Sequence, residues 1–470
     1  MKVLLFSINP ETPHFETELE LIQTYSDKGD DLYVAFCEES LTTCLFNPSH
    51  KKLLCKICIS KRVAGLKLIG GKQPNIISIN PMDDKEYSSF HFNSIQELKD
   101  LTIGNINIGK GVASTIISRY REPKIDLDKR KEELNRELNN SKHILQESQK
   151  IISNINPDLV ILFNGRFTSY HPILEYCKSK HIDFLIHERG GNFNTYMARK
   201  NETPHSRDQA EKEIKELWQQ DPSEAKLKGE LFFQERRDKV MQSWFVHSQN
   251  QTKGALPEDY DPNKKLICIF NSSRDEFESV DGWLETLYES EYDAIDKIAT
   301  SLKGKDKYQL FLRVHPNLSN LVNSQTENIN RLKLKHPHLY IIPAEDNIDS
   351  YSLIDICSKV IVFNSTIGLE ATFWNKPTIV IGRAIYENLE CSYIPNTHNE
   401  VIELIEKDLT PKPRINAIKV GNWIREFGTK FLHTHQTGIN KATFKGKKVN
   451  PKMVWRVLSK IYFSIKKFKK

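Results

Sequence analysis

The sequence predicts an α/β fold made of two similar halves. In each half, short apolar runs alternate with helical stretches, a pattern typical of buried parallel strands joined by crossover helices. The chain has 470 residues, about three times the length of an average domain, which favours two domains. A stretch rich in Gly, Pro, Asp and Asn near residues 250–263 is the expected joint between the halves.

The expected strands define the two domains. The first half carries strands at 2–8, 157–164 and 183–188, and a charged helix over 126–155. The second half carries strands at 265–270, 308–314, 339–342, 359–363 and 377–381. We therefore expect an amino-terminal domain over 1–250, a carboxy-terminal domain over 264–430 and a tail over 431–470. Ligands of open parallel sheets bind beyond the carboxyl ends of the strands, and two such sheets facing each other form an interdomain cleft.

Composition and charge exclude several classes of protein. Hydrophobic residues at 39% and charged residues at 27% fit a globular chain and exclude a disordered or fibrous one. No run reaches the roughly 18–20 apolar residues that span a bilayer, and the amino terminus is interpreted as a first strand rather than a signal peptide. The net charge is +6, but twelve basic and no acidic residues follow Glu426, so an acidic body precedes a basic tail.

The tail predicts a basic amphipathic helix. One helical face carries apolar residues, and lysines and Arg456 enrich the rest; the apolar positions are Val454, Leu458, Ile461, Ile465 and Phe468. Such a helix is suited to an anionic membrane surface. Docking on the protein's own body is the alternative. Nucleic acid is not an expected partner, because the body is acidic and shows no recognised binding module.

The residues that follow two strands of the second half indicate an anion-binding site. After the strand at 359–363 come Ser365, Thr366 and Gly368, and then a helix that carries Glu370. Hydroxyls and free backbone N–H groups at a helix start favour a phosphate or diphosphate, and glycine there lets a ligand approach. A plain N-cap on a buried helix is the alternative. His315 ends the strand at 308–314 and is expected to donate a hydrogen bond to a phosphate.

A third block follows the strand at 265–270. We expect Asn271, Ser272 and Ser273 to line the floor of the cleft and Arg274 to meet a phosphate. Asp275 or Glu276 is expected to have a catalytic or sugar-binding role. The alternative is a solvated loop with an N-cap.

The first half offers a candidate base. Glu188 ends one strand beside two glycines, and a carboxylate at such a position can act as a general base on an acceptor hydroxyl. Asn164 and Arg166 follow a neighbouring strand and are expected to bind substrate. A structural ion pair of Glu188 with Arg166 or Arg189 is the alternative.

These blocks, in this order, resemble a known family. A strand that ends in His-Pro, a helix at 349–358, the run Ser-Thr-x-Gly-Leu-Glu-Ala at 365–371 and a Lys-Pro strand look like bacterial capsule and surface-polysaccharide glycosyltransferases of GT-B architecture. The resemblance is firm over about 264–390 and looser over 155–200. It implies two Rossmann-like domains facing an interdomain cleft, with the acceptor on the side of the first domain and a nucleotide-sugar bound by the second. The residues that match its nucleotide and phosphate contacts are His315, Ser365, Thr366 and Glu370.

The chain is also similar to the Kdo transferases of capsule assembly, which use a CMP-activated sugar and a carboxylate early in the second domain. Asn271 stands where we align that carboxylate, so the sugar and the stereochemical outcome stay open. A polyol-phosphate transferase of the teichoic-acid kind shares the block order. A nucleotide-sugar epimerase and a non-catalytic glycan- or nucleotide-binding protein are further alternatives.

The resemblance completes the functional expectation. A sugar would pass from a nucleotide-sugar to a surface polysaccharide or lipid-linked glycan in the cytoplasm, on the inner face of the plasma membrane. No Asp-x-Asp occupies a strand-end loop, since Asp126-Leu-Asp128 precedes a helix, and we expect no metal or other cofactor. His315 and the nearby hydroxyls would stabilise the leaving phosphate.

The cysteines allow a second interpretation. Cys37, Cys44, Cys55 and Cys58 form a C-x6-C-x10-C-x2-C array, for which zinc is an alternative. Reduced thiols are expected for all eight cysteines of the chain, because its length allows a core without disulfides.

Overall fold

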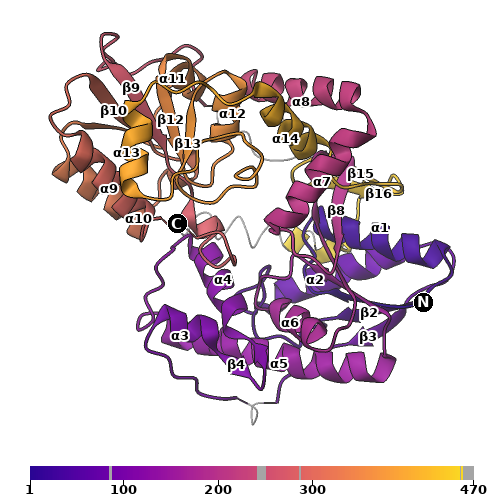
Figure 1. The fold of residues 1–470 in the computed structure, drawn as a ribbon. Helices are drawn as coiled ribbons and strands as arrows, with labels where there is room; N and C mark the ends of the chain where they lie inside the picture. Colours follow the sequence, from indigo (N-terminus) through magenta and orange to yellow (C-terminus); the bar gives the residue numbers. More distant parts are fainter. Residues whose placement is uncertain (84–86, 241–249, 285–286, 456, 459–470) are drawn as a thin grey trace. The chain divides into compact units, whose positions relative to one another are not determined.

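The computed structural model describes residues 1–83, 87–240, 250–284, 287–455 and 457–458. They form two compact units (Figure 1). Unit 1 comprises Met1–Tyr120, Ile125–His205 and the chain from Phe427 on, whereas unit 2 comprises Arg121–Lys124 and Ser206–Glu426. This division differs from the expected one in two places. The main crossing follows residue 205 rather than lying at 250–263, and the chain after residue 426 returns to unit 1 instead of standing alone.

Unit 1 contains a mostly parallel sheet. Its described strands follow the order β14-β8-β7-β6-β1-β2-β3, in which β3, β2, β1, β6 and β7 run parallel. At one edge β8 pairs antiparallel with β7, and β14 pairs antiparallel with β8. The strands are β1 (Lys2–Ser7), β2 (Asp31–Phe36), β3 (Asn75–Ser78), β6 (Leu159–Phe163), β7 (Phe184–Arg189), β8 (Thr195–Lys200) and β14 (Thr429–Lys430).

Helices cover both faces of this sheet. Alternate residues of β1 point to opposite faces, so Leu4 and Phe6 join one core with α4, α5 and α6, while Val3 and Leu5 join another with α1. The helices are α1 (His14–Asp27), α2 (Lys52–Leu66), α3 (Ile95–Asp100), α4 (Gly109–Tyr120), α5 (Lys131–Ile155) and α6 (His171–Ser179). Two short hairpins complete the unit, β4 (Thr102–Ile103) with β5 (Ile106–Asn107) and β15 (Thr434–Gly438) with β16 (Lys441–Phe444).

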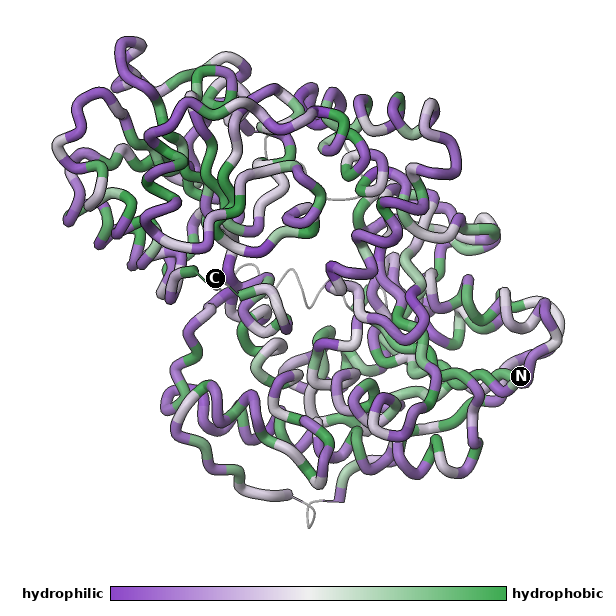
Figure 2. Tube along the Cα trace, in the orientation of Figure 1, coloured by the Kyte–Doolittle hydropathy of each residue, from purple (hydrophilic) through white to green (hydrophobic). Residues whose placement is uncertain are grey.

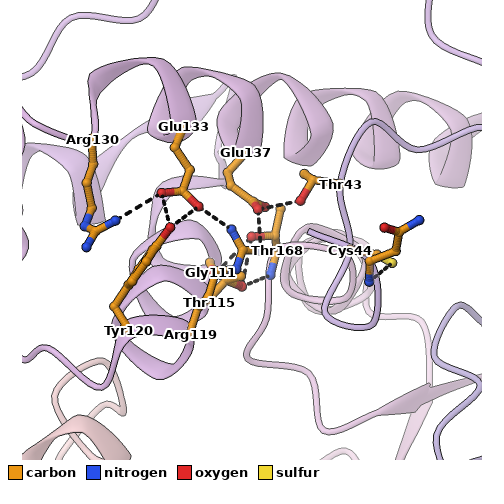
Figure 3. Close-up of polar contacts among 11 residues, drawn as sticks. Thr43, Cys44, Gly111, Thr115, Arg119, Tyr120, Arg130, Glu133, Glu137 and Thr168 are labelled. Atoms are coloured by element: carbon orange, nitrogen blue, oxygen red, sulfur yellow. Dashed lines mark hydrogen bonds and ion pairs between the residues drawn. The ribbon is translucent and has the colours of Figure 1, made fainter. Parts of the chain in front are cut away.

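A buried ion-pair network joins α4 to α5 (Figure 3). Arg119 donates from its two terminal nitrogens to Glu133 and to Glu137, each at 2.7 Å. Glu137 is fully buried and also accepts a hydrogen bond from the Thr43 hydroxyl at 2.7 Å. A buried carboxylate is tolerated only when such partners offset its lost hydration, so this network fixes how the two helices pack.

The carboxy-terminal segment is anchored on unit 1 by one carboxylate. Glu20 of α1 is 1% exposed and accepts the backbone N–H groups of three consecutive residues, Leu432 at 2.6 Å, His433 at 3.0 Å and Thr434 at 2.8 Å. Phe444 of the following hairpin is buried against the same face as Phe15 and Leu19. The predicted separate tail is therefore, up to β16, part of unit 1.

Unit 2 contains a wholly parallel sheet with β9 at its centre. The described strands follow the order β11-β10-β9-β12-β13, and the five strands predicted for the second half are all confirmed. Their apolar residues stand out in Figure 2. The strands are β9 (Lys265–Phe270), β10 (Tyr308–Arg313), β11 (Leu339–Ile342), β12 (Lys359–Val362) and β13 (Thr378–Val380).

Eight described helices belong to unit 2. They are α7 (Arg207–Gln220), α8 (Pro222–Arg237), α9 (Glu291–Leu302), α10 (Ser324–Lys335), α11 (Ser350–Ile356), α12 (Ile367–Phe373), α13 (His398–Glu406) and α14 (Arg414–Glu426). The α/β class predicted for both halves is thus confirmed.

Two glycines explain why α8 belongs to unit 2. A Cβ atom at Gly229 of α8 would lie 2.2 Å from the carbonyl oxygen of Ile418 in α14, and one at Gly421 of α14 would lie 2.6 Å from the Phe233 ring. The two helices therefore pack with their backbones in close approach. This packing makes the end of α8 part of unit 2.

The structure describes only the start of the segment that is expected to contact a membrane. None of the described helices is long and apolar enough to cross a membrane. The predicted amphipathic helix over 454–470 lies mostly outside the described residues. Of its start, Met453, Val454, Val457 and Leu458 are exposed.

We predict that Glu20→Ala destabilises the protein by about 2–4 kcal/mol, because three buried N–H groups lose a charged acceptor. Denaturant unfolding measures the loss, and hydrogen exchange should show faster exchange at the amides of residues 432–434. Glu132→Ala, at an exposed position of α5, is the matched control with a small effect. Unchanged exchange at those three amides would contradict the anchoring role.

Candidate functional site

Two side chains tie together the carboxyl ends of the central strands of unit 2. Asn271 follows β9 and accepts, at Oδ1, the backbone N–H of His315 after β10 at 2.8 Å. Ser272 accepts, at Oγ, the backbone N–H of Asn364 after β12 at 3.0 Å. The strand order reverses at β9, because β10 and β11 continue on one side and β12 and β13 on the other. Ligands of open parallel sheets bind at such a reversal.

A pocket of about 610 Å³, open solvent included, lies at this edge. Of the residues predicted from the sequence, those that line it are Asn271, His315, Ser365, Thr366 and Glu370. Residues that the sequence reasoning missed also line it, among them Arg236, Arg313 and Tyr351. The pocket therefore joins the three predicted strand-end blocks with side chains from α8 and α11.

His315 lines this pocket, and one hydrogen bond defines the tautomer of its neutral ring. Its Nδ1 accepts the backbone N–H of Asn317 at 3.1 Å, so a neutral ring carries its proton on Nε2. Pro316 starts a short 3-10 turn, Pro316–Leu318, which ends the strand as predicted. The geometry is thus suited to the expected role of His315 as a donor to an anion.

Arg313 is a buried cation without an ion pair among the described residues. It is the last residue of β10, 2% exposed, and its guanidinium donates to the carbonyl oxygens of Pro343 and, at 3.0 Å, Asp346. Its Nε has no hydrogen-bond partner. Burial lowers the pKa of Arg313, with Asp346 opposing that effect. The available signal in the sequence was a single arginine ending an otherwise apolar strand.

Both carboxylate oxygens of Glu370 accept hydrogen bonds from other side chains of the protein. It is 2% exposed, its Oε1 accepts a hydrogen bond from Arg236 Nε at 3.1 Å, and its Oε2 accepts one from the Tyr351 hydroxyl. Burial works to lower the pKa of Arg236, but the charges and hydrogen bonds of Glu370 and Tyr351 together outweigh it and raise that pKa. Glu370 thus lines the pocket as predicted, yet its carboxylate holds Arg236 and Tyr351 in place.

Gly368 does not line the pocket, and the structure gives it another role. A Cβ atom there would lie 2.5 Å from the Tyr386 hydroxyl and 2.7 Å from Cγ2 of Val362. Glycine is needed for α12 to pack on β12, rather than to let a ligand approach.

Four further candidates follow β9 and do not line the pocket, namely Ser273, Arg274, Asp275 and Glu276, and Arg121 Nε lies 3.4 Å from Oδ2 of Asp275. The Ser273 hydroxyl donates to Asp275 at 2.6 Å, and the Arg274 guanidinium pairs with Glu278 at 2.9 Å. Glu276 is exposed and accepts a hydrogen bond from the Asn317 amide at 2.7 Å. Ser272 also lies behind the pocket wall. Ser273 and Asp275 are buried, and the Ser273 side chain makes no cap hydrogen bond, so the block is not the solvated, N-capped loop of the alternative.

In unit 1, Glu188 lies at the end of β7 among partners of its own. Its Oε2 accepts a hydrogen bond from the Asn164 amide at 2.7 Å, and its Oε1 accepts the backbone N–H of Arg189 at 2.9 Å. The same Oε1 lies 3.4 Å from Nδ1 of His14, a residue that the sequence reasoning missed. The Arg189 guanidinium instead donates to the carbonyl oxygen of Ile439 at 2.6 Å. Among the described contacts, Glu188 meets His14 rather than the Arg189 guanidinium of the alternative ion pair.

Arg166 and the cysteines lie elsewhere in unit 1. Arg166 donates to the Ser118 hydroxyl at 3.4 Å and stacks on the Phe167 ring. All eight cysteines are free thiols. Burial raises the pKa of Cys44, and of Cys58 to about 11, so both stay protonated. Within the described ranges, no three His, Cys, Asp or Glu side chains are placed to hold a metal ion, which leaves the zinc alternative without a ligand set.

A comparison with protein families identifies a segment that includes much of this pocket. Residues 284–393 match the model of one family, described as capsule polysaccharide biosynthesis proteins. The predicted resemblance is confirmed for this segment. The capsule-family segment runs from before α9 to beyond β13 and holds most of the pocket's predicted residues, namely His315, Ser365, Thr366 and Glu370.

Other comparisons add little. None of the curated proteins matches the chain. Solved structures with similar folds include two KpsC domains of Thermosulfurimonas dismutans, the beta Kdo 2,4 transferase (12% identity, 56% of this chain and 79% of that one, TM-score 0.31) and the beta Kdo 2,7 transferase (11%, 67% and 89%, 0.35). A UDP-GlcNAc 2-epimerase from Neisseria meningitidis is also similar (12%, 89% and 98%, 0.28). At these scores the likenesses carry no argument about activity.

The Gly368→Ala variant tests whether this glycine is needed for helix packing or for the approach of a ligand. Because the added methyl group meets Tyr386 and Val362, we predict a loss of about 1–3 kcal/mol in stability, the usual cost of overpacking. Thermal and denaturant unfolding of the ligand-free protein measure it. An unchanged melting temperature combined with lost ligand binding would show instead that the glycine serves the ligand.

Proposed function

We propose that the protein is a glycosyltransferase that moves a sugar from a nucleotide-sugar to a surface polysaccharide or lipid-linked glycan. The observation that carries this proposal is Arg313, a buried cation that lines the unit 2 pocket and has no ion pair within the part of the chain that the structure describes. The pocket lies at the strand-order reversal, and the capsule-family segment supplies much of its wall. A buried charge of this kind favours a ligand that carries the opposite charge.

The phosphate of the donor is the proposed anion. When the bond between the sugar carbon and the phosphate oxygen breaks, negative charge develops on the leaving phosphate. Fixed donors that are already oriented stabilise that charge at little reorganisation cost. Arg313, Nε2 of His315 and the hydroxyl of Ser365 are the proposed donors, and with them we propose that transfer needs no metal. The Thr366 hydroxyl lines the pocket but donates to Oε1 of Glu370 at 3.3 Å.

Asn271 has a structural role. Its amide oxygen is used by the backbone N–H of His315, and its amide nitrogen donates to the Ser272 carbonyl oxygen at 3.2 Å. Asn271 therefore keeps the two strand ends in register instead of supplying a catalytic carboxylate. The donor can still be a CMP-activated sugar, and a panel of nucleotide-sugars identifies its base and sugar.

The basic carboxy-terminal segment is proposed to hold the enzyme at the inner face of the plasma membrane. The exposed apolar residues Met453 and Val454 are 78% and 56% accessible and follow directly on Lys452. Apolar side chains beside lysines are suited to the interface of an anionic bilayer.

His315→Ala tests the donor pocket. We predict an affinity for nucleotide-sugars about 10- to 100-fold weaker than that of the wild type, because a hydrogen bond to a charged group is lost. Titration calorimetry with CMP-, UDP- and GDP-sugars provides the measurement. His338→Ala is the matched control, since His338 is exposed just before β11, at the opposite edge of the sheet. Binding of no donor by folded wild-type protein would refute the proposed function.

Deletion of residues 453–470 tests the membrane proposal. The cut leaves Lys452, whose backbone N–H donates to the Ser60 hydroxyl at 2.8 Å. We predict that the truncated protein no longer sediments with phosphatidylglycerol vesicles, while donor affinity is unchanged. Phosphatidylcholine vesicles are the control. If the truncation unfolds unit 1 instead, the segment is structural and the membrane role fails.

A further inference from the structure

Helix α2 of unit 1 has one side that serves neither the core nor a pocket. Toward the unit, Gly65 packs on α1, where an added Cβ atom would lie 2.7 Å from the Phe15 ring. Ile57 and Lys61 line a pocket of unit 1 of about 960 Å³, open solvent included. The remaining side, here called the α2 stripe, carries the exposed residues Lys52, Lys56, Val63 and Lys67 and the half-buried Ile59. At 3.6 residues per turn these positions fall within about 80° of one another around the helix.

The α2 stripe is basic, and few carboxylates oppose its charge. Helix α2 contains no Asp or Glu. Lys56 pairs with Glu39 at 3.0 Å, whereas neither Lys52 nor Lys67 forms an ion pair with a residue that the structure describes. Lysines that no carboxylate neutralises attract an anionic surface.

The chain after β16 runs back along α2. Lys445 lies beside Gly70, just beyond the helix, where an added Cβ atom would be 3.2 Å from the lysine Nζ. Val449 is buried. The backbone N–H of Lys452 then donates to the hydroxyl of Ser60, near the middle of α2 and at the flank of the stripe, at 2.8 Å. The residues that follow Lys452 therefore begin beside the α2 stripe.

This part of the chain contributes both charge and apolar surface. Its exposed residues include Lys447, Lys448, Lys452, Met453, Val454 and Val457. No acidic residue follows Glu426. At an anionic bilayer, lysines meet the phosphates while apolar side chains enter the boundary of the acyl chains. A soluble polyanion would engage the lysines and leave the apolar side chains in water, so the mixture favours a bilayer.

We infer that the α2 stripe and the described chain after Lys445 form one docking face for an anionic lipid bilayer. The inference rests on the proposed membrane role of the carboxy-terminal segment and extends it to the folded body of unit 1. Because a folded helix is part of the face, binding fixes how unit 1 lies on the bilayer. Helix α5 then lies on the side away from the lipid, since it packs on the opposite face of the unit 1 sheet from α1 and the end of α2.

Vesicle binding by charge-matched variants of the full chain tests this face. The double variant Lys52→Gln, Lys67→Gln should bind phosphatidylglycerol vesicles about 10- to 30-fold more weakly than the wild type, at the usual contribution of a lysine near an anionic surface. The matched control Lys129→Gln, Lys131→Gln removes the same charge from exposed positions at the start of α5 and should bind like the wild type. Both double variants should keep the melting temperature and the nucleotide-sugar affinity of the wild type.

A tryptophan on the α2 stripe tests its depth in the bilayer. With phosphatidylglycerol that carries brominated acyl chains, Val63→Trp should lose more fluorescence than the wild type, because the added indole enters the acyl boundary. Lys131→Trp on α5 is the control and should show no added quenching.

The outcomes separate the inference from the proposals on which it rests. Vesicle binding unchanged by the Lys52, Lys67 double variant, or no added quenching by Val63→Trp, overturns the inference while the role of the carboxy-terminal segment stands. Loss of dextran sulfate binding by the double variant, with vesicle binding unchanged, also overturns it, since the partner is then a soluble polyanion. Failure of the wild type to bind vesicles refutes the membrane role together with this inference, whereas glycosyl transfer is tested separately by donor binding.

Discussion

The unit 2 pocket depends on how the carboxyl ends of β9, β10 and β12 are joined. Hydrogen bonds from the backbone after β10 and β12 converge on two buried side chains, Asn271 and Ser272. Loops after parallel strands have no ladder to hold them, so without these bonds each loop would be positioned by its own turn alone. The bonds set the spacing of His315 from the hydroxyl residues after β12, and hence the shape of the pocket.

Two arginines that line the unit 2 pocket differ in their partners. Arg236 has a carboxylate partner in Glu370, which also accepts a hydrogen bond from Tyr351. Arg313 donates only to carbonyl oxygens among the described residues. Burying a charge without an ion pair costs stability, and this cost supports the proposed anion site at Arg313.

Much of the fold followed from local patterns, whereas long-range contacts were not visible in the sequence. Each strand of unit 2 is a short apolar run, and all were predicted, as were His315, Ser365 and Thr366 at their ends. The crossing after residue 205 was missed because it depends on Gly229 and Gly421 meeting across two helices far apart in the chain. Arg236 and His14 were missed for the same reason, since their partners Glu370 and Glu188 lie well over a hundred residues away.

A structure of the protein with a bound nucleotide-sugar tests the central claim most directly. The account predicts a donor phosphate oxygen within hydrogen-bond distance of Arg313 and of Nε2 of His315, in the pocket at the end of β10. A nucleotide bound with its phosphates away from both side chains, or seated in the pocket of unit 1, would contradict it.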